Sequence, residues 1–354
     1  MSGEGVVGMA DGGAGIRHPF AEAPSEGGAL EVAEDVLWLR LPLPMALDHV
    51  NVYALRDADG WTVVDTGLWS KRGTALWQAL LDGPLAGAPV RRVLVTHHHP
   101  DHIGMAGWFQ AQGAELLMPR TAWLYARMLT LDEQAVAPQE TVTFWRRAGM
   151  PAAMLAEKRA SRPFNFADVV TPMPLGFTRI AEGDQLTLGG RRWQVRMGDG
   201  HAPEHATLWS LDDRLILGGD QVLPGISPNI GVYPTEPEAD PLTDWLDSTR
   251  RFQPLAREDH LVLPGHKLPF TGLPLRLRQM EENHTAALPR LLEHLAEPRS
   301  AADCFVVLFR RPIGPAEFPL AMAESVAHLN HLLRLGLVSR TLSDEGAWLW
   351  TRAA

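Results

Sequence analysis

Four histidines and one aspartate crowd into residues 96–104, which read THHHPDHIG. The stretch follows the apolar residues 93–95, and an apolar, β-branched run of this kind predicts a buried strand. Histidine and aspartate side chains at the end of such a strand are typical of a metal site. Because His97 and His99 are two residues apart, their imidazoles can point to the same side of an extended loop. The aspartate and the last histidine lie one short turn further on, so the pattern predicts two adjacent metal positions.

The pattern HxHxDH in this stretch resembles the signature of the metallo-β-lactamase superfamily, and three later motifs match the same family in the same order. GHAPEH is similar to the element GHxxGH, whose first histidine, here His201, is a ligand, although Glu204 stands where glycine is common. GGD is similar to the strand end that carries the metal-bridging aspartate, here Asp220. PGH is similar to the strand that brings the last histidine, His266. The resemblance covers residues 32–270.

The resemblance implies a binuclear centre of five histidines and two aspartates. Nitrogen and hard oxygen ligands without thiolate suit zinc and also tolerate iron or manganese, so we expect two Zn²⁺ ions. Two further residues are expected to support the ligands from outside: Asp65, which ends a predicted strand, and His205. The ligands implied are His97, His99 and His201 for one ion, Asp101, His102 and His266 for the other, and Asp220 between them.

The resemblance also implies a hydrolase. Two divalent cations flanking one water lower its pKa, so a metal-bridging hydroxide can attack a carbonyl at neutral pH. We expect catalytic roles for Asp101 and Asp220, and for Tyr233, because lactonase-like relatives use a tyrosine beyond the bridging aspartate to polarise the carbonyl. A bridging aspartate is typical of the glyoxalase II-like, lactonase-like and nuclease-like branches, of which the first is expected here. The only cysteine, Cys304, lies in the C-terminal module, which argues against a dedicated β-lactamase.

The expected substrate is a thioester, ester or lactone of an apolar acyl group. One alternative is a phosphodiesterase or ribonuclease of the same fold. Another is a mononuclear iron persulfide dioxygenase, which uses a subset of the same ligands and would hold one iron per chain. A purely binding role would not require seven ligands.

Apolar and alternating runs predict an α/β fold. A β-meander is expected over residues 36–42, 50–55 and 61–64, then a helix over 72–81. The second half repeats the pattern, with strands predicted at residues 177–188, 192–197, 207–211, 214–217 and 260–263. Two β-rich halves with helices around them fit the four-layer αββα sandwich that the resemblance implies. We assign residues 31–274 to this catalytic domain and residues 1–30 to a flexible tail.

A helical insertion is predicted at about residues 120–174, between the two halves. It is unusually aromatic, so it is interpreted either as a lid that shapes an apolar pocket over the metals or as a local helical core. The lid hypothesis expects Trp123 and Trp145 to contact an acyl chain. The aromatic residues are Trp123, Tyr125, Phe144, Trp145, Phe164 and Phe166.

Residues 275–354 are predicted to form a separate module. A long helix kinked at Pro289, helices over 301–309 and 318–335, and a hairpin around residues 343–346 resemble a winged helix. His284 lies on the apolar stripe of the long helix and is interpreted as a core or supporting histidine. Residues 276–354 contain nine arginines, nine acidic residues and no lysine, so their charges balance. A module that binds nucleic acid needs several phosphate contacts, so nucleic-acid binding is not expected. The module is expected to pack on the catalytic domain or on a second subunit of a homodimer.

Composition and net charge narrow the classes of partner and the cellular compartment. A net charge of −10 argues against polyanion and membrane-surface partners, which leaves a small molecule as the expected partner. A single cysteine excludes an internal disulfide and fits a reducing compartment. No run of ~18 apolar residues and no signal-like N-terminus is present, so a cytoplasmic protein without a membrane span is expected.

Overall fold

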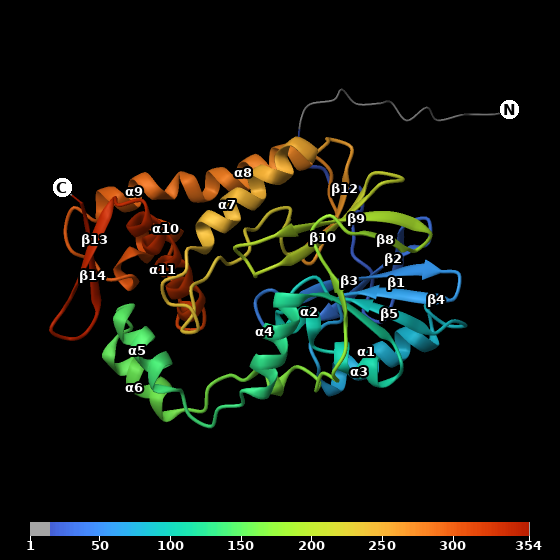
Figure 1. The fold of residues 1–354 in the computed structure, drawn as a ribbon, viewed down its shortest axis with the longest axis horizontal. Coiled ribbons are helices and arrows are strands. Elements are labelled where there is room, and N and C mark those ends of the chain that lie inside the picture. The colour runs from blue at the N-terminus through green and yellow to red at the C-terminus, as the bar shows by residue number, and fades with distance from the viewer. Residues whose placement is uncertain (1–14, 354) are drawn as a thin grey trace.

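The computed structural model describes residues 15–353, and over this range the strands form two large sheets that pack face to face (Figure 1). The first sheet begins as an antiparallel meander and continues in parallel from its fourth strand onward. Its strands, in order, are β1 (Ala29–Ala33), β2 (Val36–Pro42), β3 (His49–Asp57), β4 (Gly60–Val64), β5 (Val90–Leu94), β6 (Glu115–Pro119) and β7 (Thr178–Ile180).

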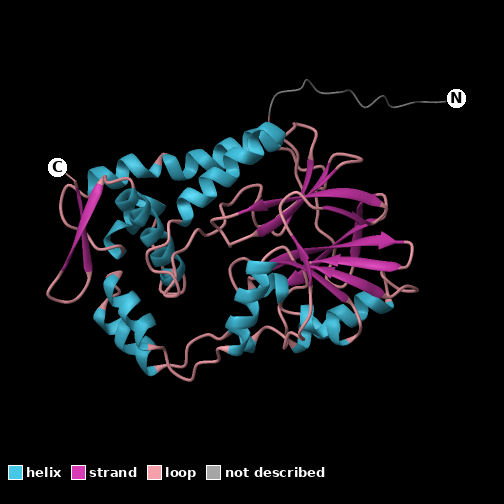
Figure 2. Ribbon diagram, viewed as in Figure 1, coloured by secondary structure: helices cyan, strands magenta, loops and turns pink. Residues whose placement is uncertain are grey.

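The second sheet is antiparallel except for one parallel pair, β11 and β12, at its edge. Its strands, in order, are β12 (Leu261–Pro264), β11 (Leu215–Gly219), β10 (His205–Ser210), β9 (Arg191–Gly198) and β8 (Gln185–Leu188). Helices cover the outer faces of both sheets, as Figure 2 shows. They are α1 (Lys71–Asp82), α3 (Ala106–Ala111) and α4 (Arg120–Leu131) on the first sheet, and α7 (Pro241–Phe252) and α8 (Leu273–Thr285) on the second.

The alternation of side chains along the strands produces these layers. In β3, Val52 and Ala54 pack under the helices of the first sheet, whereas Tyr53 and Leu55 pack against the second sheet. In β11, Leu217 faces the first sheet and Ile216 faces the helices of the second. The central strands β3 and β11 are therefore buried on both faces, as expected for sheets covered on both sides, whereas edge strands such as β7 and β8 are partly exposed. The predicted four-layer αββα sandwich is confirmed.

One predicted strand, residues 177–188, is wrong as a single element. It is two strands, β7 and β8, that belong to different sheets. A tight turn separates them, in which Asp184 accepts a hydrogen bond from the Ala181 N–H at 2.8 Å and Gly183 takes a positive φ of 86°. Such a turn lets the chain leave the first sheet and enter the second.

Part of the segment predicted to be a flexible tail packs on the sandwich. The first 14 residues lie outside the described range. Arg17 pairs through its backbone with Thr271, and the ring of Phe20 meets that of Trp38 edge-on at 6.4 Å. The prediction of a tail up to residue 30 is therefore wrong for residues 15–30, because these residues bury apolar surface and form backbone hydrogen bonds.

The remaining elements lie in the ligand loop, in the insertion, after α7 and in the C-terminal segment. The break between α8 and α9 falls at Ala286, three residues before Pro289, which has no N–H to donate to the carbonyl of Thr285. The elements are α2 (Pro100–Ile103), α5 (Gln139–Arg147), α6 (Ala152–Ala160), η1 (Phe166–Asp168), η2 (Gln253–Leu255), α9 (Ala287–His294), η3 (Ala302–Cys304), α10 (Phe305–Phe309), α11 (Phe318–Arg334), β13 (Val338–Leu342) and β14 (Trp348–Arg352).

The far part of the insertion packs into the C-terminal core. Phe144 and Met150 share one apolar cluster with Leu329 of α11 and Trp350 of β14. Figure 1 shows α5 and α6 beside the β13–β14 hairpin and well away in space from α4, although α5 follows α4 closely in the chain. The second half of the insertion is thus held by the C-terminal segment, so the insertion as a whole connects the sandwich to that segment.

Helix α11 is buried along most of its length and packs on the catalytic region. Asn330 donates hydrogen bonds from its side chain to the carbonyls of Pro237 and Ala239, at 3.0 and 2.9 Å, and His331 lies 3.2 Å from Asp240. Of the two expected packing modes, the structure shows the first, against the catalytic region. None of the helices within residues 15–353 combines the length and the apolar character that a membrane crossing requires.

Candidate metal centre

The predicted ligands lie on loops that leave one edge of the sandwich. Parallel strands end at the same edge of a sheet, and β4 with β5 and β11 with β12 are such pairs. A ligand loop follows the end of β5, β11 and β12, and another joins β9 to β10. The structure therefore brings together all seven residues that the resemblance implied: His97, His99, Asp101, His102, His201, Asp220 and His266.

Their donor atoms form overlapping groups. His97, His99 and His201 place one donor atom each within 4.8 Å of one another. In this group, His97 Nε2 lies 3.0 Å from His99 Nδ1. Two ligand atoms on one tetrahedral ion with bonds of ~2.0 Å lie ~3.3 Å apart. The first group therefore has the spacing of ligands to one cation.

The second group joins Asp101, His102 and His266. Asp101 Oδ2 lies 3.6 Å from His102 Nε2 and 3.4 Å from His266 Nε2. Asp220 stands between the groups: its Oδ1 lies 3.4 Å from His102 Nε2, and its Oδ2 lies 3.6 Å from His201 Nε2 and 3.2 Å from His266 Nε2. A carboxylate that faces both groups is placed as a bridging ligand would be.

A second observation, the presence of unpaired buried donor atoms, also indicates that the centre could hold divalent cations. Three buried donor atoms, His102 Nε2, His201 Nε2 and Asp220 Oδ1, have no hydrogen-bond partner among the described residues. Buried polar atoms are rarely left unpaired, and all three belong to predicted ligands of this one centre. At Gly265, an added Cβ would stand 2.2 Å from Asp220 Oδ1, so only glycine leaves room for the carboxylate.

Asp65 holds the ligand loop from behind, as expected. Its Oδ2 accepts a hydrogen bond from His102 Nδ1 at 2.8 Å, and its Oδ1 accepts one from the Thr96 N–H at 2.8 Å. The Thr96 hydroxyl also donates to Asp65, at 2.9 Å, and lies 3.0 Å from His97 Nδ1. These contacts fix the outer nitrogen of two ligand rings, which leaves Nε2 of each ring for a metal.

Backbone carbonyls orient two more ligand rings. His201 Nδ1 donates to the carbonyl of Asn229 at 2.8 Å, and His266 Nδ1 donates to the carbonyl of His49 at 2.7 Å. Sequence reasoning missed both partners, because a carbonyl is present at every residue and has no motif. His205 has the expected supporting position: its Nε2 accepts the Asp220 N–H at 3.0 Å, and its ring stacks on His97 at 4.4 Å.

Burial and charge set the protonation of the centre. Desolvation, followed by the nearby His102 and His205, holds the pKa of His97 well below its usual range, so the ring is neutral, as a ligand must be. Desolvation opposes ionisation of Asp220, but the facing His266 and His102 outweigh it and hold the pKa of Asp220 well below its usual range. The bridging position is thus occupied by a carboxylate.

Not every histidine of the motif faces the centre. His98 is buried, and its ring lies 5.3 Å from Tyr125 and stacks at 6.5 Å with Phe166. It therefore links the ligand loop to the insertion, where a cavity of about 440 Å³ is walled by Phe166 and Trp145. Other residues that line this cavity are Leu129, Met150, Lys158, Arg162, Pro163 and Phe164.

The two tryptophans expected to contact an acyl chain are placed differently. Trp145 lines the cavity, whereas Trp123 is buried in the core under the first sheet, where its ring stacks on Phe177 at 4.7 Å. The expectation that Trp123 contacts the acyl chain is therefore wrong. Trp123 lies on the first turn of α4, on the side of the helix that faces the first sheet. Helical spacing alone does not tell which side of a helix faces a sheet.

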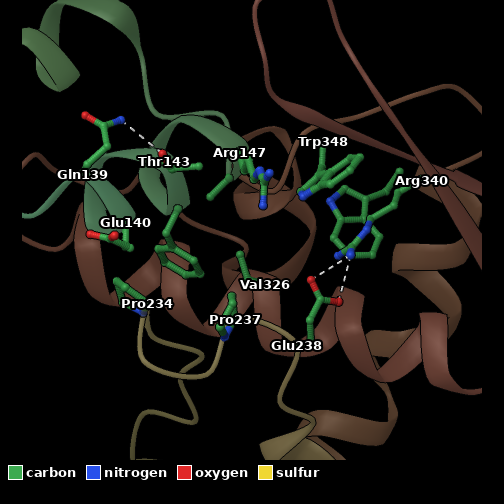
Figure 3. Close-up of a pocket in the computed structure, with 13 residues that line it drawn as sticks. Gln139, Glu140, Thr143, Arg147, Pro234, Pro237, Glu238, Val326, Arg340 and Trp348 are labelled. Atoms are coloured by element: carbon green, nitrogen blue, oxygen red, sulfur yellow. Dashed lines mark hydrogen bonds and ion pairs between the residues drawn. The ribbon is translucent and has the colours of Figure 1, made fainter.

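A second cavity, of about 310 Å³, lies between α5, the hairpin and the loop before α7 (Figure 3). In Figure 3, Arg340 stands beside Trp348 and reaches Glu238, with two contacts of 2.8 Å. None of the seven predicted ligands lines this cavity or the larger one beside Phe166; only the larger one is linked to the ligand loop, through the contact of Phe166 with His98.

Tyr233 lies on the loop after β11 and is linked to a ligand through one intermediate residue. Its hydroxyl lies 3.4 Å from the side-chain oxygen of Asn229, and the backbone carbonyl of Asn229 in turn holds His201. The residue as a whole is 43% exposed, but desolvation, followed by the nearby Glu324, raises the pKa of its hydroxyl to about 12, so the hydroxyl keeps its proton at neutral pH.

Glu204, the departure from the family motif, adopts the left-handed backbone region with φ of 50°. Glycine is common at this position because it takes this conformation without strain. The Glu204 carboxylate accepts the N–H of Thr121 in the first turn of α4, whose own N-cap residue, Pro119, offers no side-chain acceptor. Here the loop that carries His201 therefore also caps the first helix of the insertion.

Comparison with known proteins gives the same family. Residues 45–266 match the model of the metallo-β-lactamase superfamily, and residues 288–353 match the metallo-β-lactamase-like C-terminal domain. The crystal structure of a β-lactamase domain protein from Burkholderia ambifaria is 37% identical, with a TM-score of 0.88 over 96% of this chain and 98% of that one.

Two further relatives agree along most of their length. A metallo-β-lactamase family protein from Thermus thermophilus is 27% identical, with a TM-score of 0.76 over 91% of this chain and 100% of that one. The Bacillus subtilis (strain 168) protein named "Probable metallo-hydrolase YqjP" is 27% identical over 318 residues, 84% of this chain and 92% of that one. The chain belongs to the metallo-β-lactamase superfamily and is a metallo-hydrolase of that fold.

Proposed function

We propose that the protein hydrolyses a thioester, ester or lactone of an apolar acyl group at a pair of Zn²⁺ ions. The observation that carries this proposal is the aromatic cavity of the insertion, which is linked to the ligand loop through one ring contact. Its wall residue Phe166 stacks on His98, and His98 lies between the ligands His97 and His99 in the chain. An acyl chain in this cavity would therefore approach the metals with its carbonyl end.

In this proposal, the chain's residues hold and orient the reacting groups. Bound there, two divalent cations would supply a hydroxide at neutral pH and stabilise the negative charge that develops on the carbonyl oxygen. Asp220 would fix the distance between the ions, and Asp101 would complete the second site. The hydroxyl of Tyr233 would donate a hydrogen bond to the carbonyl oxygen.

The proposal places the protein in the glyoxalase II-like branch, with a winged-helix-like C-terminal module that does not read nucleic acid. Asp220 at the bridging position supports the branch. Cys304 is buried in the C-terminal segment and so is not a ligand of the β-lactamase type. A recognition helix must present an exposed face to a groove, and the burial of α11 against the catalytic region supports a packing role.

Metal analysis of the purified protein, combined with an activity panel, tests the proposal. We expect two catalytic zinc ions per chain and turnover of acyl-thioesters, esters or lactones. Cleavage of phosphodiesters or short RNA, fading steeply between low and moderate salt, would replace it with the nuclease alternative. One iron per chain with oxidation of a persulfide would replace it with the dioxygenase alternative.

A further inference from the structure

A second group of metal-type side chains lies outside the catalytic centre, where α8 meets α11. His284 of α8 and Glu324 and His328 of α11 each place a donor atom within 4.8 Å of the others. Glu324 and His328 are four residues apart, so they lie on the same face of the helix, one turn apart. Two nitrogens and one carboxylate oxygen form a donor set that suits Zn²⁺ with a water as fourth ligand.

The hydrogen bonds of His328 turn one nitrogen toward the group. Its Nδ1 donates to the Glu324 carbonyl at 2.9 Å, so its Nε2 carries no proton when the ring is neutral. This Nε2 lies 3.3 Å from His284 Nδ1. That distance is long for a hydrogen bond, but it equals the ~3.3 Å expected between two nitrogens on one tetrahedral ion.

A buried histidine and a half-buried carboxylate at this place lack full compensation. His284 is 1% exposed, and its Nε2 has no hydrogen-bond partner among the described residues. Burial raises the pKa of Glu324 to about 7, and the side-chain amide of Asn229, at 2.9 Å, only partly offsets this. A bound cation would stabilise the carboxylate and take His284 Nδ1 and His328 Nε2 as ligands, whereas the unpaired Nε2 of His284 faces away from it.

An opening leads to the group. A cavity of about 340 Å³ is lined by His284, Glu324 and His328, so an ion could enter and keep a water ligand. Arg290 and Arg310 also line this cavity. Their charges oppose a cation, so the affinity should be lower than in a site with two carboxylates, although they could hold an anion as the fourth ligand.

We propose that His284, Glu324 and His328 form a third divalent-cation site, which ties α8 to α11. Besides joining these two helices, this site reaches the catalytic centre through one residue. The Glu324 carboxylate accepts a hydrogen bond from the side-chain amide of Asn229. The backbone carbonyl of Asn229 in turn accepts one from His201 Nδ1 at 2.8 Å and so orients that ring. An ion at the third site would therefore steady the loop that positions a catalytic ligand.

Metal counting on the full chain tests this site. The protein is stripped with a chelator, reloaded with Zn²⁺, desalted and analysed by mass spectrometry for metals. The measured quantity is the difference from wild type, so it does not depend on how many ions the catalytic centre holds or on its activity. His284→Gln and His328→Gln should each hold about one ion fewer than wild type and lose part of the thermal stabilisation that Zn²⁺ confers.

His331→Gln is the matched control, because His331 is a buried histidine on the same helix that bonds to Asp240 and Thr243 outside the group. It should keep the wild-type count. Equal counts in wild type and both site variants would overturn the proposal. Should the site variants fail to fold, anomalous scattering at the zinc edge from wild-type crystals decides: a peak between His284 and His328 supports the site, and its absence in zinc-loaded crystals overturns it.

Discussion

The imidazole of His102 and the carboxylate of Asp65, 37 positions apart in the chain, are joined by a bond of 2.8 Å between Nδ1 and Oδ2. Both side chains are buried, and Asp65 holds this position with a left-handed backbone, φ of 61°. Strained backbone conformations persist where the surroundings determine them strongly, and they gather at functional sites. The relationship places Asp65 as the anchor of the whole ligand loop.

Asp65→Asn should weaken metal binding without unfolding the protein. The amide keeps the shape, but its NH₂ group only donates, so one of the two hydrogen bonds that Asp65 accepts, from His102 or from the Thr96 N–H, is lost. Loss of such an outer partner typically costs about 10–100-fold in metal affinity or activity. Competition with a chelating dye measures the affinity. Asp57→Asn is a control, since Asp57 is also buried at a strand end but bonds Thr62 and Gly189; equal metal affinities in the two variants would contradict the role of Asp65.

Asp220→Ala and His99→Ala should abolish hydrolysis for different reasons. Asp220 faces ligands of both groups, so its loss should leave fewer than two catalytic ions per chain. His99 belongs to one group only, so its loss should release or misplace one ion. Metal content and kcat/KM measured on the same preparation check both. Full activity with unchanged metal content in either variant would be incompatible with the centre described above.

The ligand positions could be predicted from the sequence because each is tied to a short local pattern. An apolar strand run that ends in histidine or aspartate, as at residues 93–102 and 215–220, indicates both the strand and the loop that follows it. Parallel pairing then brings the loops to one edge. The four layers followed from the same runs, since a strand buried on both faces needs cover on both sides.

Other features depend on packing that no local pattern encodes. The carbonyls of His49 and Asn229 orient ligand rings, but a backbone carbonyl leaves no mark in the sequence. Trp123 and Trp145 both lie on predicted helices, yet one faces the sheet and the other a cavity. The difference arises from how each helix docks, which is a tertiary property. The same holds for the packing of α5 against the C-terminal segment.

Substitutions at Glu204 should separate backbone strain from helix capping. Glu204→Ala keeps the left-handed conformation but loses the acceptor for the Thr121 N–H, so we expect a loss of about 1 kcal/mol in the free energy of unfolding. Glu204→Gly also loses the acceptor, but it relieves left-handed strain worth about 1 kcal/mol. Urea unfolding should therefore rank wild type and the glycine variant above the alanine variant. A glycine variant less stable than the alanine variant would show that strain is unimportant here.

Tyr233→Phe tests the proposed hydrogen bond to the carbonyl oxygen. If the hydroxyl acts mainly on the developing charge, kcat should fall while KM changes little, since the lost interaction is specific to the transition state. The effect expected for one hydrogen-bond donor is about 10²-fold in kcat. Asn229→Ala provides a comparison, because it removes the amide beside the hydroxyl without touching the phenol ring. Unaltered turnover in the phenylalanine variant would assign Tyr233 to loop packing.

The cavity wall offers the sharpest test of the acyl substrate, because Trp145 lines the cavity and Trp123, in the same insertion, does not, so the two serve as variant and control. Trp145→Ala removes apolar surface from the cavity, so KM should rise more for long-chain than for short-chain acyl substrates, by about tenfold if ~1.4 kcal/mol of contact is lost. Trp123→Ala removes a buried ring from the core under the first sheet, so it should lower the free energy of unfolding by about 3–5 kcal/mol and leave the chain-length preference unchanged. Steady-state kinetics over a chain-length series, with metal content measured in parallel, separates the two. An equal effect of Trp145→Ala on every chain length would show that the acyl chain does not occupy this cavity, even if the metal centre hydrolyses the substrate.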